Sequence, residues 1–309
     1  MSRISRDLAS GPHNPSSSNG TTSNMHHINR LSAKTPNVAI IGAGFSGLRC
    51  ADVLHRSGAK VTVFEARNRI GGRVNQVSSG GYLMDMGANW IHGTNGNAIL
   101  KLAEQTGTVI MEPEEDQAVF DAGGSRKSDE EAAELTSTLW GMVVKAFKYS
   151  DENSAAINAE TSLMDYFKQE LPKQFKDKRK LEDMLKEAQM WGPFVGDPIE
   201  TQSLKFFFLE ECIDGENVFV ASTYRRILEE VGRTPTGAGL IQFNTEVRQI
   251  TRDKGSDGSS SVKITMTDGT TQAFDEVVVT CPLGWLKRNK QAFSPSLPSR
   301  LSQAIDNIK

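Results

Sequence analysis

Residues 37–51 read NVAIIGAGFSGLRCA, and residues 61–67 read VTVFEAR. The apolar, β-branched run at 38–41 predicts a buried parallel strand. The pattern GxGxxG follows directly at 42–47 and leads into a predicted helix at 46–57. Its glycines permit a tight turn, a close approach of the backbone to a pyrophosphate, and close packing of helix on sheet. The amides and the positive dipole end of the helix would then face the phosphates.

A carboxylate completes this βαβ unit. The second predicted strand, 61–64, ends on Glu65, which lies 23 residues after Gly42. The dinucleotide-binding pattern has an acceptor for a ribose hydroxyl about 20 residues after its glycines. Glu65 could also be an ordinary surface acid at a strand end. The strand before the glycines, the helix after them and the acid together favour a dinucleotide site over a simple glycine-rich turn.

The next residues distinguish between dinucleotides. Residues 66–73 read ARNRIGGR, so a second glycine pair and three arginines follow the acid. A nicotinamide-binding unit usually continues here with a polar loop or a helix. Glycines let the backbone approach a ligand closely, and one arginine side chain can donate two parallel hydrogen bonds to phosphate oxygens. The pattern therefore favours FAD over NAD.

Two motifs together resemble those of the flavin-containing amine oxidase family. They are EARNRIGGR at 65–73 and DMGANWIHG at 85–93. Within the family the chain is most similar to polyamine oxidases and lysine-specific histone demethylases, and the resemblance extends from about Val38 to Lys309. It implies an α/β fold. The expected parts are an FAD-binding, Rossmann-like βαβ domain of the glutathione-reductase-like type, a mostly helical substrate-domain insertion and an antiparallel β meander.

The resemblance and the glycine pattern assign a set of FAD-binding residues. They are Gly42, Ala43, Gly44, Ser46, Gly47, Glu65, Ala66, Arg67, Gly72, Arg73, Gly87, Ala88, Asn89, Trp90 and Val247. By resemblance, Arg73 binds the pyrophosphate, residues 87–90 run under the flavin, and the backbone of Val247 pairs with the adenine edge. Trp90 could equally be a core residue. Of Arg67 and Arg69, we expect one to face solvent.

His92 is the candidate catalytic residue. In some polyamine oxidases a histidine or an acidic residue stands at this position and faces the substrate channel. A hydrogen-bonded histidine without a chemical role is the alternative. The resemblance places the catalytic lysine, which holds a water near flavin N5, beyond the end of this chain. We therefore interpret the chain as truncated after its first part and expect this fragment to be inactive by itself.

Periodicity changes along the chain. Apolar residues recur at helical spacing behind a capping-box pattern at 128–131, and alternation begins near residue 240. A serine at 222 is expected to cap the helix that follows, where relatives have a glycine pair. The further predicted helices are 96–106, 161–170, 177–191 and 222–232. The predicted meander strands are 240–243, 247–252, 262–267 and 270–274, followed by a buried strand at 276–282.

These patterns suggest three regions. Residues 1–36 are rich in serine and poor in large apolar residues, so we expect a disordered tail. We assign 37–110 plus 236–285 to a discontinuous FAD-binding domain. We assign 111–235 plus 286–309 to a partial substrate-binding domain. The basic run at 173–180 predicts a solvated helix face, with a partner site as the alternative.

Composition limits the class of protein. The 309 residues are 38% hydrophobic and 24% charged, with a net charge of −3, which gives no reason to expect nucleic acid or an anionic membrane as partner. Three cysteines, Cys50, Cys212 and Cys281, have no metal-binding or disulfide spacing. We expect reduced thiols, no metal, and an intracellular protein located in the cytoplasm. Peroxisomal, nuclear and mitochondrial locations stay open.

The resemblance implies FAD-dependent oxidation of polyamines or related small amines with release of hydrogen peroxide. Two alternatives remain. One is a demethylase-like chromatin protein that uses the same chemistry on a peptide. The other is an inactive truncated fragment. The sequence does not identify the amine, the general base or the oligomeric state.

Overall fold

The computed structural model describes residues 35–112, 118–210, 213–254 and 260–308. The expected tail lies outside these residues except for its last two positions, and Cys212 lies outside them too. The described residues form two compact units. The strand-containing unit comprises 35–90, Ala98–Met111 and 219–308, and the helical unit comprises Ile91–Asn97 and Glu112–Val218 without its gaps.

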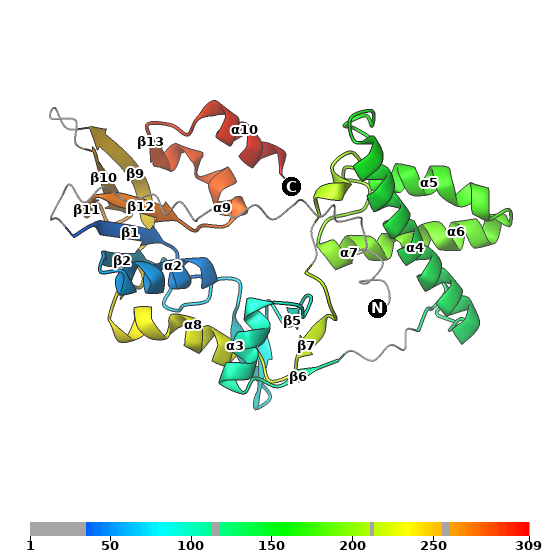
Figure 1. The fold of residues 1–309 in the computed structure, drawn as a ribbon, viewed down its shortest axis with the longest axis horizontal. Coiled ribbons are helices and arrows are strands. Elements are labelled where there is room, and N and C mark those ends of the chain that lie inside the picture. Colours follow the sequence, from blue (N-terminus) through cyan, green and yellow to red (C-terminus); the bar gives the residue numbers. More distant parts are fainter. Residues whose placement is uncertain (1–34, 113–117, 211–212, 255–259, 309) are drawn as a thin grey trace, which may run out of the picture. The chain divides into compact units, whose positions relative to one another are not determined.

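A four-stranded parallel sheet organises the strand-containing unit. Its order is β12-β1-β2-β8, formed by β1 (Asn37–Ile41), β2 (Lys60–Phe64), β8 (Ile241–Gln242) and β12 (Glu276–Val279). Strand β1 pairs in parallel with both neighbours, with Val38 opposite Glu276 on one side and Val61 on the other. Helix α2 (Phe45–Arg56) connects β1 to β2, as the sequence predicts (Figure 1).

Alternate residues of β1 and β2 face two different layers. Ile40, Val61 and Val63 pack with Leu48 of α2 and Leu228 of α8 (Arg225–Gly237). Helices α2 and α8 thus lie on one side of the sheet (Figure 1). The opposite side chains, including Ala39, Ile41 and Phe64, pack with a second sheet.

The second sheet is the expected meander with two differences, because it lacks the predicted first strand and gains the strand Phe293–Ser294, which pairs in parallel with the strand Val247–Lys254. Its order is β11-β10-β9-β13, from β9 (Val247–Lys254), β10 (Ser260–Met266), β11 (Thr271–Phe274) and β13 (Phe293–Ser294). The run at 240–243, predicted as its first strand, instead forms β8 at the edge of the parallel sheet, so that prediction is wrong. Val63 N donates to Leu240 O and Glu65 N to Gln242 O, and Ile241 joins the core beside α2.

The remaining elements are shorter. Strands β3 (Gln76–Ser79) and β4 (Tyr82–Asp85) form a hairpin. Helix α3 (Ala98–Thr106) packs on α8. A small sheet has the order β5-β7-β6, from β5 (Trp90–Ile91), β6 (Ile110–Met111) and β7 (Val218–Val220). Helices α9 (Leu283–Arg288) and α10 (Ser299–Asn307) follow near the carboxyl end.

Helix α8 starts differently from the expectation. Its N-cap position is Tyr224, which makes no side-chain capping hydrogen bond. The hydroxyl of Ser222 instead accepts a hydrogen bond from Val109 N at 2.8 Å. The prediction that Ser222 caps this helix is therefore wrong, because its oxygen is used by a backbone amide of a distant segment.

The helical unit is built around an aromatic and aliphatic core. Its helices are α4 (Asp129–Asn153), α5 (Leu163–Gln174), α6 (Lys178–Glu187) and α7 (Trp191–Val195), shown in green in Figure 1. The apolar stripe of α4, including Leu135, Leu139 and Val143, is buried in this core, as its spacing predicts. Ser128 caps α4, because its hydroxyl accepts from Glu131 N at 3.2 Å.

The boundaries of the compact units differ from the expected domains. Residues 219–235 and 286–308, expected in the substrate-binding part, belong to the strand-containing unit. The reason is packing: α8 lies against α2 and α3, and β13 pairs with β9 through Phe293 and Ile250. Within the described ranges, no helix is both long enough and apolar enough to cross a membrane.

Candidate functional site

The first glycine turn lies at the carboxyl end of β1. Gly42 has a φ of 103° and donates its N–H to Phe64 O at 2.8 Å, so the turn is tied to β2. A Cβ on Gly47 would lie 1.9 Å from Gly42 O, so the start of α2 packs too closely on the turn for any side chain. A Cβ on Gly44 would meet nothing within 4 Å. Space for a ligand therefore exists at Gly44, beside the first amides of α2.

Glu65 lies at the opening of this turn and is only 7% exposed. Its Oε2 accepts from Ala43 N at 2.8 Å, and its Oε1 accepts from Arg67 N at 2.9 Å. Each carboxylate oxygen can accept a further hydrogen bond. The structure therefore holds an ionisable group rigidly at the glycine turn, with acceptor capacity that a ribose hydroxyl can use.

The second glycine pair packs on the first. Gly71 N donates to Ala43 O at 2.8 Å, and a Cβ on Gly72 would lie 3.4 Å from Gly44 Cα. Arg69 donates to Ile70 O and Gly72 O, both at 3.1 Å, so this arginine holds its own turn. Arg69 therefore has a structural role, and both Arg67 and Arg73 are exposed.

Residues 87–90 continue from this second turn. A Cβ on Gly87 would lie 1.8 Å from Arg73 O, so only glycine fits there. Asn89 O accepts from Val220 N at 2.8 Å. Trp90 is half-buried and meets Phe219 edge to face, with ring centroids 5.4 Å apart. One side of Trp90 is thus packed in protein.

The segment before β9 is bound to the Glu65 region. Thr245 N donates to Glu65 O at 2.9 Å, and Asn244 N donates to Arg67 O at 3.0 Å. The side chain of Val247 is 7% exposed and belongs to the core between the two sheets. The structure thus brings the two glycine turns, Glu65 and the region of Val247 together at one edge of the parallel sheet.

The residues that follow β12 also contact the first glycine turn, although the sequence pattern gave them no role there. Thr280 Oγ1 donates to Ile41 O at 2.8 Å and lies 3.2 Å from Gly42 O. Cys281 lies next to it, and burial together with the charge of Glu65 raises the pKa of its thiol to about 11. The available signal was topological, because the carboxyl ends of neighbouring parallel strands meet at one edge.

His92 lies in the other compact unit from the glycine turns and Glu65. It belongs to the helical unit, and its side chain is exposed. Its backbone oxygen accepts from Asn97 Nδ2 at 3.0 Å, which shapes the loop before α3. No group of three or more His, Cys, Asp or Glu side chains in the described part of the chain could hold a metal ion.

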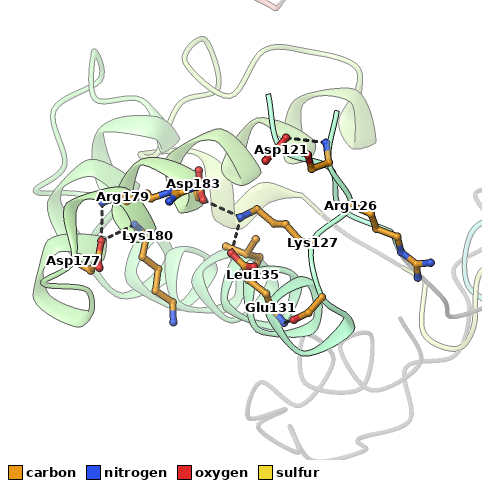
Figure 2. A pocket seen from close by; sticks show the side chains of 11 residues that line it. Asp121, Arg126, Lys127, Glu131, Leu135, Asp177, Arg179, Lys180 and Asp183 are labelled. Atoms are coloured by element: carbon orange, nitrogen blue, oxygen red, sulfur yellow. Dashed lines mark hydrogen bonds and ion pairs between the residues drawn. The ribbon is translucent and has the colours of Figure 1, made fainter. Parts of the chain in front are cut away.

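The helical unit contains a charged hollow of about 490 Å³ (Figure 2). Lys127 Nζ donates to Glu131 Oε1 at 2.5 Å and to Asp183 Oδ2 at 3.0 Å, which raises the pKa of the lysine and lowers that of Asp183. Asp177 Oδ1 accepts from Arg179 N at 2.8 Å as the cap of α6. Lys127, Glu131 and Asp183 thus pair with one another at this hollow.

Comparison with known proteins identifies the class. Residues 45–309 match the family described as flavin containing amine oxidoreductase. The chain is 32% identical to polyamine oxidase 4 of Oryza sativa subsp. japonica, over 91% of this chain and 58% of that protein. The chain therefore belongs to the flavin-containing amine oxidoreductase family, and it spans 58% of the length of this relative.

Other similar proteins are amine oxidases and a histone demethylase. Polyamine oxidase 2 of Arabidopsis thaliana is 29% identical over 90% of this chain and 57% of that protein. Lysine-specific histone demethylase 2 of Homo sapiens is 27% identical over 88% of this chain but 33% of that protein. A solved putrescine oxidase bound to putrescine superimposes with a TM-score of 0.60 at 20% identity, covering 88% of this chain and 63% of that one. This likeness shows that the two share a fold.

Proposed function

We propose that the strand-containing unit binds FAD at the carboxyl edge of its parallel sheet. The observation that carries this proposal is Glu65, a buried carboxylate held 2.8 Å from Ala43 N beside the open space at Gly44. The diphosphate would lie over Gly44 and the first turn of α2, where free amides and the helix dipole favour negative charge. Glu65 would accept from the adenosine ribose.

The remaining cofactor contacts extend from these two points. We infer that Arg73, which is exposed, binds the diphosphate and that the backbone near Val247 meets the adenine. The parallel order β12-β1-β2-β8, with α2 on one face and the meander on the other, supports the Rossmann-like, glutathione-reductase-like type of fold. We infer that this unit is the cofactor-binding domain and that the helical unit is part of a substrate-binding domain.

For the whole protein we propose FAD-dependent oxidation of polyamines or related small amines. The supporting observations are family membership and the names of the relatives, several of which are polyamine oxidases. When bound, the flavin would accept the two electrons of amine oxidation, and dioxygen would reoxidise it with release of hydrogen peroxide. A demethylase-like role is less well supported, because the matching demethylase is covered over only 33% of its length.

In this proposal the described residues bind and orient the cofactor. Glu65, Gly44 and the amides of α2 hold the adenosine diphosphate half, and residues 87–90 limit where the ring half can lie. His92 stays a candidate for contact with the amine. No acid or base among the described residues is assigned to the reaction.

A cofactor titration tests the proposal. The purified 309-residue chain is titrated with FAD, and binding is followed by the visible absorbance and fluorescence of the flavin. We expect saturable binding that replacement of Glu65 by Gln weakens and that replacement of the exposed Glu104 by Gln leaves unchanged. If the absorbance and fluorescence of FAD are the same with and without the chain at every FAD concentration, the proposal is contradicted.

A further inference from the structure

Tyr224 is hydrogen-bonded to the segment 85–90 through both its backbone amide and its side-chain hydroxyl. Its backbone N donates to Asp85, with 3.0 Å to Oδ2 and 3.2 Å to Oδ1. Its phenol OH donates to Trp90 O at 2.6 Å. Tyr224 is 5% exposed, so both interactions lie inside the strand-containing unit. One residue thus fixes the two ends of this six-residue segment.

The conformation of the preceding residue is unusual. Thr223 has a φ of 68° and is 8% exposed. A β-branched residue in the left-handed region is a genuine outlier, because its side chain is crowded against the backbone there. Such strain persists only where the surrounding structure over-determines it, and it is concentrated at functional sites. The strain here immediately precedes the amide that Asp85 binds.

Asp85 is itself held in place from the other side. Gln76 Nε2 donates to Asp85 Oδ1 at 2.6 Å, and Gln76 lies opposite Asp85 in the β3–β4 hairpin. Burial and the charge of Asp85 raise the pKa of Tyr224 to about 12, so its hydroxyl stays protonated and remains a donor near neutral pH. The three groups form a connected set whose hydrogen bonds are all made within the protein.

Close backbone contacts connect the segment 85–90 to the turn that we propose for the diphosphate. The adenosine end is placed by Glu65 and the region of Thr245, and the diphosphate by Gly44. A Cβ on Gly72 would lie 3.4 Å from Gly44 Cα, and a Cβ on Gly87 would lie 1.8 Å from Arg73 O, so close backbone contacts connect Gly44 through residues 72–73 to Gly87. An extended dinucleotide that continues past its diphosphate therefore meets residues 87–90 next.

We propose that Tyr224 and Asp85 are positioning residues that hold residues 85–90 in the shape required by the ring half of the cofactor. This inference rests on the proposed FAD site. Neither side chain is required to touch the cofactor. Both residues act on the segment itself, because the backbone amide of Tyr224 holds Asp85 at its start and the phenol OH of Tyr224 holds Trp90 O at its end.

The test compares two ligands of different length. ADP carries only the adenosine diphosphate half, whereas FAD also carries the ring half. Dissociation constants for both are measured with the full 309-residue chain as wild type, Tyr224→Phe and Asp85→Asn. Tyr82→Phe is the matched control, because Tyr82 lies in the β3–β4 hairpin with Asp85 but is 76% exposed. Thermal melting without ligand reports whether each variant folds.

We expect Tyr224→Phe to weaken FAD binding about tenfold, the scale of one lost hydrogen bond at a buried acceptor. ADP binding should stay within about twofold of wild type, because Glu65 and the glycine turns are unchanged. The circular dichroism of bound flavin should also change, since it reports the surroundings of the ring. Asp85→Asn should show the same separation between the two ligands, and Tyr82→Phe should change neither.

The possible outcomes are distinct. If wild type binds both ligands and Tyr224→Phe binds FAD equally well with an unchanged flavin spectrum, the positioning role is wrong and the proposed function stands. If Tyr224→Phe loses ADP and FAD binding in parallel, the tyrosine supports the whole unit and the positioning role is also wrong. If folded wild type binds neither ligand, the proposed function fails and the inference fails with it.

Discussion

Carboxylates are treated differently in the two compact units. In the strand-containing unit, Glu65 is 7% exposed and both of its oxygens accept backbone amides at the glycine turn. In the described part of the helical unit, the carboxylates that form ion pairs keep between 23% and 84% of their side-chain surface exposed. Burying a charge is costly unless it is fully hydrogen-bonded. Asp52 of the strand-containing unit is also buried, at 5% exposure, but it pairs with Arg49 and Arg56. Glu65 is therefore distinguished by its backbone partners at the glycine turn, whereas the exposed pairs belong to an ordinary surface.

Stability of the helical unit should come from its core and not from those charges. Trp140 and Trp191 meet edge to face with ring centroids 5.8 Å apart, and Trp191 meets Phe207 at 5.7 Å. Aromatic burial contributes several times more than an exposed ion pair. The following substitutions test this contrast between the units.

The largest effect is expected from Phe167→Ala in α5. Phe167 is fully buried in the helical unit, so its removal leaves a cavity and should cost about 3–5 kcal/mol of the free energy of unfolding. Chemical denaturation followed by circular dichroism measures this. Phe206→Ala, at a side chain that is 52% exposed, should cost much less. Equal losses for the two variants would contradict the assigned core.

Two glycines of the same turn should separate folding from binding. Gly47→Ala places a Cβ 1.9 Å from Gly42 O and should destabilise the strand-containing unit by about 1–3 kcal/mol. Gly44→Ala meets nothing within 4 Å, so it should leave unfolding without ligand unchanged but weaken FAD binding. Denaturation and FAD titration of both variants distinguish these effects. If Gly44→Ala binds FAD with the affinity of the wild type, FAD does not occupy the space at Gly44.

Glu65→Ala should weaken FAD retention by about 1–3 kcal/mol, because it leaves a ribose hydroxyl and the amide of Ala43 without their acceptor. The FAD dissociation constant measures the change directly. Glu104→Ala, at an exposed acid of α3, serves as the control and should bind FAD as wild type does. An affinity that does not differ between the two variants would argue against the ribose contact.

A smaller effect of opposite sign is expected at Thr223. Thr223→Gly relieves a left-handed conformation with a φ of 68° and should raise the free energy of unfolding by up to about 1 kcal/mol. The gain is limited because glycine also has more freedom in the unfolded chain. Thr234→Gly in helix α8 should instead destabilise, since its position is helical. A destabilised Thr223→Gly would show that the threonine side chain contributes more than its strain costs.

The smallest effect should come from the surface of the helical unit. Lys180 and Glu134 are 2.5 Å apart but remain 38% and 48% exposed. Lys180→Met should therefore change the free energy of unfolding by less than about 0.5 kcal/mol. Denaturation at low and high salt should give nearly the same small difference. A loss comparable to that of Phe167→Ala would overturn the contrast between core and surface.

Local spacing made the βαβ unit predictable. The strand at 38–41, the glycines at 42–47 and Glu65 all lie within 30 residues, and the structure contains this unit as β1, α2 and β2. The apolar stripe of α4 was predictable for the same reason, because a helix imposes a period that appears directly in the sequence. In both cases the interactions join residues that are near one another in the chain.

Other predictions failed where a pairing partner was distant. The run at 240–243 has the alternation of a meander strand, but β8 pairs in parallel with β2, where Val63 lies opposite Ile241. Ser222 has the chemistry of a helix cap, but its hydroxyl accepts from Val109, which is 113 positions away. The run 240–243 and Ser222 could each make either of two chemically reasonable interactions, and packing against the rest of the fold selected one of them.

The sequence by itself determined the βαβ unit, the position of its acidic residue and the resemblance to the flavin-containing amine oxidases. Those features depend on residue type and short spacing. Only the tertiary structure decided that Asp85 binds Tyr224, 139 positions away, and that Thr280 lies against the first glycine turn. The sequence indicates which side chains can form hydrogen bonds. Which partner it finds depends on the chain segments that packing brings within about 3 Å, the length of a hydrogen bond.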